Sequence, residues 1–380
     1  SINPMQKRVM IVAGEASSEM FGALLSQQLK ALAPEVSLYG MGGVRMEREG
    51  VQIITPIVSS HGLVEVFRLL GRLKKSFDTL VRTMRKNRPD VLVLIDYPDF
   101  NIPLAKKAKA LGIPTVYYVS PTVWAWRRGR AKKIAHRVNA IALIFPFEVS
   151  IYKPLGVPCE FVGHPVLDCH EQLFPPGSLN HHEARLRLGL DPHRPTLAIM
   201  PGSRSGEIRQ HMPILKQAIK VLQSKHPELQ FVIPQAPGVD LKTSSDGITL
   251  VNERTGEVLL ASDGAVIASG TAALEACFFH TPMVMIYKTP SFNYFLAKKI
   301  IKIKTISHVN MILDKTIVPE LIQEKFTVTN VVCHVEKILW DIEYRNSMIN
   351  AFKEVSKIFG PSGASYKTAK MVSRAAGWNL

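Results

Sequence analysis

Short apolar, β-branched runs alternate with longer amphipathic stretches from the start of the chain. The first three are RVMIVAG (8–14), MFGALLSQQLKAL (20–32) and VSLYGMGG (36–43). A strand, a helix and a strand in this order are typical of a parallel sheet covered on both faces. The next expected strands are 51–56, 91–96, 115–120, 140–145 and 159–163, with helices near 62–86, 102–111 and 129–137. The first half is therefore predicted to be one doubly wound domain.

The pattern stops at 168–195, which is rich in Pro, His and charge and is expected to be a linker. It then restarts with strands at 196–203, 229–235, 248–252, 264–270 and 283–288, and helices at 208–223, 255–261 and 271–279. We therefore expect an α/β protein with two Rossmann-like parallel-sheet domains facing across a cleft. Residues 1–167 would form the first domain and residues 196–380 the second. The sequence leaves open whether the C-terminal helices pack back on the first domain.

Composition narrows the function classes. A chain of 380 residues with 46% hydrophobic content exceeds one core, since single cores stop growing near roughly 250 to 300 residues. The net charge of +16 favours anionic partners: nucleic acid, acidic lipid or phosphorylated metabolites. The four cysteines lie far apart without a C-x-x-C pair, which argues against a zinc site or disulfides and suits the cytoplasm. No apolar run approaches the ~18 residues of a membrane-spanning helix.

Candidate chemistry lies at strand ends, because open α/β sheets bind ligands there. In the second half, one strand runs into Gly202, Ser203 and Arg204 immediately before a helix. Backbone N–H groups and a guanidinium at a helix N-terminus suit a phosphate. A second small turn, Ser269–Thr271, opens another helix, with Glu275 one turn further on to accept from ribose hydroxyls. Ordinary Gly-Ser turns are the alternative, but two of them in one sheet favour a nucleotide-diphosphate site.

The first turn of the chain, GEASSE (14–19), has neither G-x-G-x-x-G nor Gly-Lys-Ser/Thr, so it supports neither a dinucleotide-dependent oxidoreductase nor a P-loop kinase. Its carboxylates would repel a phosphate. Glu15 and Ser17 are better suited to sugar hydroxyls, and an acidic N-capping turn is the alternative.

Two further strand ends carry polar groups. The strand at 91–95 ends in Asp96, Asp99 and Asn101, and a carboxylate there can act as a general base. Asp99 equally suits the N-cap of the next helix. The strand at 115–120 carries Ser120 at its end and leads to Trp124, followed by several cations. Trp beside cations can stack on sugars or bases, and packed aromatics are the alternative.

The segment 62–75 carries an apolar band wider than a core-facing stripe needs, interleaved with cations, which suits shallow insertion into an anionic membrane surface. Burial against its own sheet is the competing interpretation. The predicted membrane patch is Leu63, Val64, Val66, Phe67, Arg68, Leu69, Leu70 and Arg72.

Taken together, segments along nearly the whole chain resemble a known family. They include VAGEAS (12–17), KNRPDVLVLIDYPDFN (86–101), YYVSPTVWAWR (117–127), MPGSRSGEI (200–208) and IASGTAALE (267–275). The chain resembles the lipid-A-disaccharide synthases, inverting glycosyltransferases of the two-Rossmann-domain (GT-B) type. The family pattern usually has Gly-Glu-Thr-Ser-Gly-Asp where this chain has GEASSE, so Ser18 replaces a glycine and Glu19 an aspartate.

The resemblance implies that UDP-2,3-diacylglucosamine donates its sugar to 2,3-diacylglucosamine 1-phosphate at the cytoplasmic face of an inner membrane. The products would be a β(1→6) disaccharide and UDP. Carried onto matching positions, Asp96 is the base, Arg204 and Ser269–Thr271 hold the diphosphate, Glu275 binds ribose and Asn310 is a further donor-site group. In-line attack implies neither a metal nor a cofactor.

Two other functions stay open on the residues alone. A nucleotide-sugar epimerase of the same architecture would keep the diphosphate turns but would need no lipid-facing patch. A basic nucleic-acid-binding protein would show steeply salt-dependent binding and no turnover of a UDP-sugar. The resemblance implies no nucleic-acid partner, and the sequence leaves open whether the chain forms a homodimer.

Overall fold

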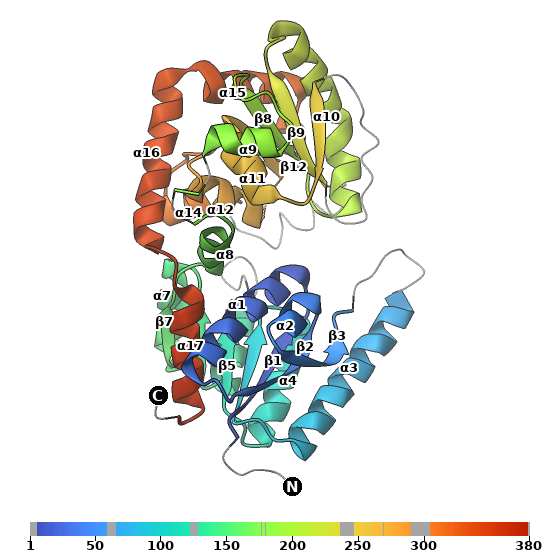
Figure 1. The fold of residues 1–380 in the computed structure, drawn as a ribbon, viewed down its shortest axis with the longest axis vertical. Helices are drawn as coiled ribbons and strands as arrows, with labels where there is room; N and C mark the ends of the chain where they lie inside the picture. The colour runs from blue at the N-terminus through green and yellow to red at the C-terminus, as the bar shows by residue number, and fades with distance from the viewer. Residues whose placement is uncertain are drawn as a thin grey trace. The chain divides into compact units, whose positions relative to one another are not determined.

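The computed structural model describes residues 6–58, 66–121, 128–175, 177–178, 180–235, 247–268, 270–289 and 305–378. They form two compact units, each built around one parallel sheet (Figure 1). The first unit is Ser1–Cys169 with Pro361–Leu380, and the second is His170–Gly360. The predicted fold class, two parallel-sheet α/β domains, is confirmed.

The first unit has a seven-stranded sheet in the order β3-β2-β1-β4-β5-β6-β7. Its strands are β1 (Arg8–Ala13), β2 (Ser37–Gly42), β3 (Val51–Pro56), β4 (Val91–Ile95), β5 (Thr115–Tyr118), β6 (Ala140–Leu143) and β7 (Cys159–Phe161). Every residue of β4 is buried, as its unbroken apolar run predicts for a strand covered on both faces. The strand order reverses between β1 and β4, so the ligand-binding edge of such a sheet lies at the ends of these two strands.

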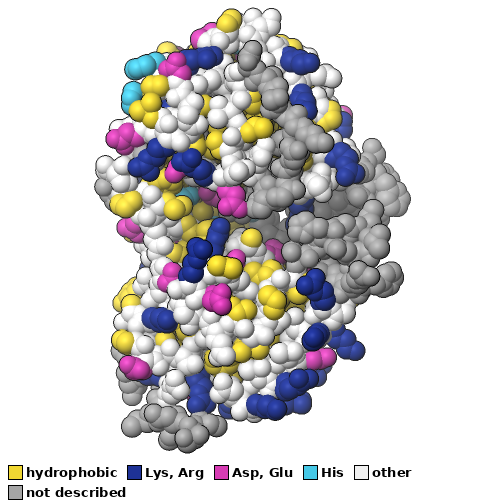
Figure 2. Space-filling model, turned by 45° about the vertical axis from the view of Figure 1, so that its right-hand side comes forward, with side chains coloured by type: hydrophobic (Ala, Val, Ile, Leu, Met, Phe, Trp, Pro, Cys, Tyr) yellow, Lys and Arg dark blue, Asp and Glu magenta, His cyan; other side chains and the backbone are white. Residues whose placement is uncertain are grey.

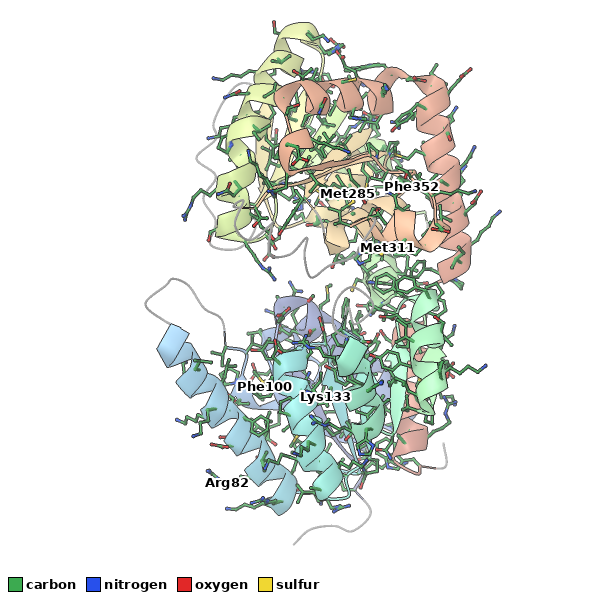
Figure 3. The ribbon with its side chains drawn as sticks, turned by 180° about the vertical axis from the view of Figure 1, so that it is seen from behind. Arg82, Phe100, Lys133, Met285, Met311 and Phe352 are labelled. Atoms are coloured by element: carbon green, nitrogen blue, oxygen red, sulfur yellow. The ribbon has the colours of Figure 1, made fainter. Side chains whose placement is uncertain are left out.

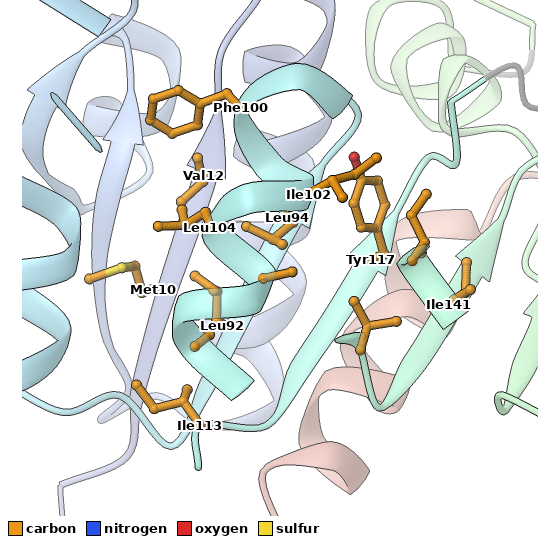
Figure 4. Packing of buried hydrophobic residues seen from close by; sticks show 14 of the residues in the cluster. Met10, Val12, Leu92, Leu94, Phe100, Ile102, Leu104, Ile113, Tyr117 and Ile141 are labelled. Atoms are coloured by element: carbon orange, nitrogen blue, oxygen red, sulfur yellow. The ribbon is translucent and has the colours of Figure 1, made fainter. Parts of the chain in front are cut away.

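Helices cover both faces of this sheet. They are α1 (Ala16–Leu32), α2 (Val44–Arg48), α3 (Val66–Lys86), α4 (Pro98–Ala110), α6 (Arg128–Arg137), α7 (Val149–Tyr152), the start of α8 (Pro165–Leu173) and α17 (Ala364–Ala375). Helices α3, α4 and α6 contact one another in series on one face, and α1 contacts both α2 and α17 on the other. Figure 4 shows the core beneath α4, where Leu92 and Leu94 of β4 pack with Leu104.

The end of the chain is integral to the first unit. Helix α17 packs against α1 and contacts β4, β5 and β6. Its start is held by the buried Asp168 of α8, whose carboxylate accepts from the backbone N–H of Gly363 at 2.5 Å and of Ser365 at 2.7 Å. Of the C-terminal helices, α17 therefore belongs with the first sheet.

The second unit has six parallel strands in the order β10-β9-β8-β11-β12-β13. They are β8 (Thr196–Met200), β9 (Gln230–Gln235), β10 (Ile248–Asn252), β11 (Gly264–Ala268), β12 (Met283–Tyr287) and β13 (Glu320–Ile322). The order reverses between β8 and β11, and these are the two strands that run into the predicted diphosphate turns. Sequence order alone could not show that the two turns would be neighbours.

The helices of the second unit are α9 (His181–Arg187), α10 (Ser205–Lys225), α11 (Thr255–Ala261), α12 (Thr271–Phe278), α14 (His308–Leu313), α15 (Val328–Trp340) and α16 (Ile342–Phe359). Met285 of β12 and Phe352 of α16 are both buried in this unit (Figure 3). The segment 168–195, expected as a linker, contains the end of α8 and all of α9, and from His170 onward it is part of the second unit.

Candidate active site

The carboxyl ends of β1 and β4 meet in a tightly packed turn. Ala13 of β1 pairs with Ile95 of β4, so the next residues of both strands are neighbours. A Cβ atom at Gly14 would lie 2.2 Å from the Tyr97 ring, so only glycine allows this approach. Asp96 and Tyr97 adopt left-handed φ angles of 47° and 48°. Such angles are uncommon for non-glycine residues and cluster at functional sites.

Hydrogen bonds to the backbone hold Asp96 in this conformation. The Asn101 Nδ2 donates to the carbonyl oxygens of Asp96 at 2.8 Å and Ile95 at 3.2 Å. The Tyr117 hydroxyl donates to the same Asp96 oxygen at 2.6 Å, and the Asp96 N–H donates to Tyr118. Asn101 was expected to contact substrate; its side chain is fully buried and its amide holds the turn, and contact with substrate stays a prediction.

The Asp96 carboxyl has the electrostatics of a base that works near neutral pH. Burial raises its pKa to about 6, with a further contribution from the negative charge of Glu15. The carboxyl is therefore mostly ionised at pH 7 yet basic enough to accept a proton, the range in which general bases are efficient. The structure thus brings Glu15 and Asp96, predicted from separate motifs, to one edge of the sheet.

A second buried carboxyl belongs to this edge and was missed as a site residue from the sequence. Glu148 follows β6 and is 1% exposed, and its Oε2 accepts from the Phe145 N–H at 3.1 Å. Burial raises its pKa to about 8, and the charge of Asp96 contributes, so Glu148 is mostly neutral at pH 7. A carboxyl in the loop that follows a buried strand was the signal in the sequence.

The other predicted groups of the first unit differ in exposure. Glu15 and Ser17 are exposed at the start of α1, where a substrate can reach them. Asp99 is exposed and pairs with Arg130, and Tyr97, rather than Asp99, is the N-cap of α4. Ser120 is buried and its hydroxyl is 2.5 Å from that of Tyr152, and its contact with a substrate stays a prediction.

The divergent GEASSE turn has a local structural explanation. The Glu19 Oε1 accepts from the Arg45 backbone N–H at 2.7 Å, which joins α1 to α2. Ser18 is buried, with no hydrogen-bond partner for its hydroxyl among the described residues. Trp124 lies outside the described residues.

The turn after β8 has the features of an anion site. Gly202 has φ 121°, and a Cβ atom there would lie 2.7 Å from the Glu207 Oε2. Ser203 and Arg204 are exposed, and Arg204 is the N-cap of the 21-residue helix α10 with no side-chain cap hydrogen bond. The exposed guanidinium and the positive end of the helix dipole both favour a phosphate here.

A buried histidine, also missed from the sequence, supports this turn from behind. His211 is 0% exposed, and its Nδ1 lies 2.6 Å from the carbonyl oxygen of Pro201. Its Nε2 accepts from the Lys288 N–H at 2.9 Å, so the imidazole is the Nδ1–H tautomer and donates to Pro201. His211 therefore ties the ends of β8 and β12 together.

The second predicted turn opens α12. Gly270, its N-cap, has φ 140°, and a Cβ atom there would meet nothing within 4 Å, so the turn needs glycine and is open. Thr271 is exposed beside it, and Ser269 lies outside the described residues. The Glu275 Oε2 is 3.2 Å from the Nε2 of His170.

Asn310 has a structural role that the sequence did not predict. It is 4% exposed, its Nδ2 donates to Val318 at 2.9 Å, and its Oδ1 accepts from the N–H groups of Ile317 and Val318. This amide holds the loop after α14, and contact with the donor stays a prediction.

The predicted membrane patch is described only in part. Leu70 is 58% exposed and Arg72 is exposed, so neither is buried against the sheet. Leu63 and Val64 lie outside the described residues, as do the side chains of Val66, Phe67, Arg68 and Leu69. Among the described residues, no helix is long and apolar enough to cross a membrane, and no cluster of three His, Cys, Asp or Glu could hold a metal. None of the four cysteines, all of which lie in the described parts of the chain, forms a disulfide.

Comparison with known proteins gives a consistent result. Residues 9–357 match the model of the lipid-A-disaccharide synthetase family. The lipid-A-disaccharide synthases of Myxococcus xanthus and Anaeromyxobacter dehalogenans are 38% and 39% identical, each over 96% of both chains.

Solved structures share the fold at much lower identity. One is the UDP-GlcNAc 2-epimerase of Neisseria meningitidis, with a TM-score of 0.63, 13% identity and coverage of 92% of this chain and 99% of that one. Another is the glycosyltransferase SnogD of Streptomyces nogalater, with a TM-score of 0.56, 19% identity and coverage of 97% and 99%. The fold is thus common to transferases and epimerases.

Proposed function

Because the chain belongs to the lipid-A-disaccharide synthase family, we propose that it transfers diacylglucosamine from its UDP conjugate to 2,3-diacylglucosamine 1-phosphate. The chain is a glycosyltransferase, and the observation that best supports a mechanism is the partly buried Asp96 at the β1/β4 switch point. An epimerase is not favoured, because the likeness to epimerases concerns the fold whereas the family match covers residues 9–357.

The proposed chemistry is an in-line displacement. The 6-hydroxyl oxygen of the acceptor attacks the anomeric carbon of the donor as the bond from that carbon to the UDP oxygen breaks. The hydroxyl proton passes to the Asp96 carboxylate, and the electron pair of the broken bond leaves with UDP. The clamped backbone of Asp96 supports this role, because a base must be held within hydrogen-bond reach of the proton it takes.

The leaving diphosphate is assigned to the two turns of the second unit. Arg204 at the start of α10 and the Gly270–Thr271 turn at the start of α12 would stabilise the developing negative charge. Their strands β8 and β11 are paired, which supports a single anion reaching both turns. Glu275, one turn into α12, would accept from the ribose hydroxyls.

We also propose that the lipid substrates are reached at the cytoplasmic surface of an anionic inner membrane. Helices α3, α4 and α6 hold fifteen Lys and Arg and two Asp, a net +13 of the chain's +16. Figure 2 shows Lys and Arg gathered on the lower part of the first unit, and Figure 3 shows Arg82 projecting from α3. Because α3 follows β3, its start, with Leu70 and Arg72, lies toward the sheet edge that carries Asp96.

Mass spectrometry provides the decisive test. The purified chain, incubated with both acylated glucosamines, should form the disaccharide, and Asp96→Asn should lower turnover by roughly two to four orders of magnitude. Isothermal calorimetry should find UDP affinity unchanged in that variant, since Asp96 is not assigned to the diphosphate. Wild-type turnover in Asp96→Asn would remove Asp96 from the mechanism, and absence of product from the wild-type chain would refute the proposed reaction.

A further inference from the structure

The second unit contains a histidine–carboxylate pair beside one of the predicted diphosphate turns. The Nε2 of His170, in the last turn of α8, lies 3.2 Å from the Oε2 of Glu275 in α12. The two side chains are 13% and 17% exposed, so the pair is shielded from solvent but still reachable. Glu275 lies four residues after Thr271 and therefore on the same side of α12.

Aromatic packing fixes the position of the His170 ring. The ring lies against Phe279, with centroids 4.3 Å apart and planes inclined by 34°. Phe279 in turn packs edge-on against Phe174, at 6.0 Å. A Cβ atom at Gly256 would lie 2.9 Å from Phe174, so α11 is in close contact with this aromatic group. Little freedom is left for the imidazole to turn away from Glu275.

The direction of the hydrogen bond follows from the donors available. An ionised carboxylate can only accept, so the His170 Nε2 carries the proton and donates to Glu275. This bond uses one of about four lone-pair sites on the carboxylate, and acceptor capacity remains for another ligand. A carboxylate fixed in this way can accept from a pair of neighbouring hydroxyls without first losing side-chain freedom.

We infer that His170 is a positioning residue for ribose recognition: its Nε2–H orients Glu275 to accept from the 2′- and 3′-hydroxyls of a nucleoside diphosphate. The inference rests on the role proposed for Glu275 and extends it to a residue outside the strand-end motifs. A site built to bond hydroxyls discriminates strongly against an analogue that lacks them, because its polar groups then stay unpaired.

The test compares UDP with 2′,3′-dideoxy-UDP by calorimetry on the full chain. The wild-type chain should bind UDP roughly ten- to a hundredfold more tightly than the dideoxy analogue. In His170→Phe, which keeps an aromatic ring against Phe279 but loses the donor, this preference should fall by about three- to tenfold. His170→Gln, which restores an N–H at a similar reach, should recover most of it.

A matched control lies in the same unit. His226 forms an equivalent pair, with its Nε2 2.8 Å from Glu336 and its ring 4.0 Å from Trp340, but it follows α10 at the opposite end from Arg204. His226→Gln should leave the affinity for both nucleotides unchanged.

Each contrary outcome overturns a different claim. Full ribose preference in His170→Phe would show that the donor is not needed. Loss of preference in both His170 variants would show that an N–H at this position does not suffice to orient Glu275, and loss in His170→Gln alone would assign the effect to ring packing. Equal binding of both nucleotides by the wild-type chain would refute the ribose role of Glu275, while disaccharide formation would still support the transferase.

Discussion

Asp96 combines a left-handed backbone conformation with a carboxyl group whose pKa is raised. Because its pKa is raised to about 6 and a base must be ionised, kcat/KM should rise as pH increases through about 6. Glu15→Gln removes the negative charge that adds to the effect of burial, so this rise should move to lower pH. The measurement is a pH–rate profile, read for the position of the rise rather than its height.

The control for that profile comes from the same turn. Glu19 bonds to the Arg45 backbone and is not among the causes of the Asp96 shift. Glu19→Gln should therefore leave the position of the rise unchanged. An identical profile in Glu15→Gln and the wild-type chain would contradict the coupling between Glu15 and Asp96.

The sequence predicted the position of single residues where a strand end could be read directly. Asp96, Arg204 and Gly270 all follow buried runs, and each lies at a switch-point edge, while their functional roles stay predictions. The structural roles of Asn101 and His211 were not predicted, because they depend on contacts with backbone groups 5 and 10 residues away whose orientation no spacing rule supplies.

Helix α10 supports the turn that precedes it through a buried side chain to which no ligand contact is assigned. His211 lies in its second turn and holds Pro201, so the loop that presents Arg204 depends on this imidazole. His211→Ala should weaken UDP binding by roughly three- to tenfold, the value of one or two lost hydrogen bonds. His211→Asn, which keeps a donor near Nδ1, should lose less.

Calorimetry with UDP and a thermal melt together decide this case. Lower melting temperature with unchanged UDP affinity would mean that His211 stabilises the unit without positioning the turn.

The sequence predicted helices α11 and α12 almost to the residue, whereas α9 lies in a Pro- and His-rich stretch that was expected to be a linker. The sequence of α9 does not show one apolar face, because Arg185 lies on the buried side. The structure accommodates this guanidinium by its hydrogen bonds to Asp263 and to the Ala261 carbonyl.

The charge of the whole molecule is concentrated on one set of helices, and membrane binding should depend on where those charges lie. Lys74 and Lys75 are exposed in the half of α3 that lies toward the Asp96 edge, and Lys106 and Lys107 are exposed near the far end of α4. Lys74→Glu with Lys75→Glu should weaken binding to acidic-lipid vesicles by roughly tenfold or more, since each cation near such a surface contributes about 1 kcal/mol.

Vesicle sedimentation at several salt concentrations measures this effect. The matched double change at Lys106 and Lys107 should have a smaller effect, because it alters the net charge equally at the opposite edge of the sheet. Equal losses would mean that only the net charge matters, and no loss in either would refute the membrane surface proposed for α3.

The fold class followed from alternation of strands and helices over the full length. The return of α17 to the first unit could not be predicted in this way, because the pattern of an amphipathic helix does not show which sheet it packs against. A chain ending at Gly360 should leave the first unit destabilised, since buried Thr368, Ala369 and Val372 would be lost from beside α1 and β5. Proteolysis or urea titration should show the first unit failing before the second.

That return of the chain also constrains how the protein is made. A ribosome delivers the first 169 residues early, yet the helix that completes their sheet covering emerges only after the whole second unit has been synthesised. The apolar surface that α17 covers therefore stays exposed on the nascent first unit until synthesis reaches this helix. The second unit can reach its native state before the first unit is complete.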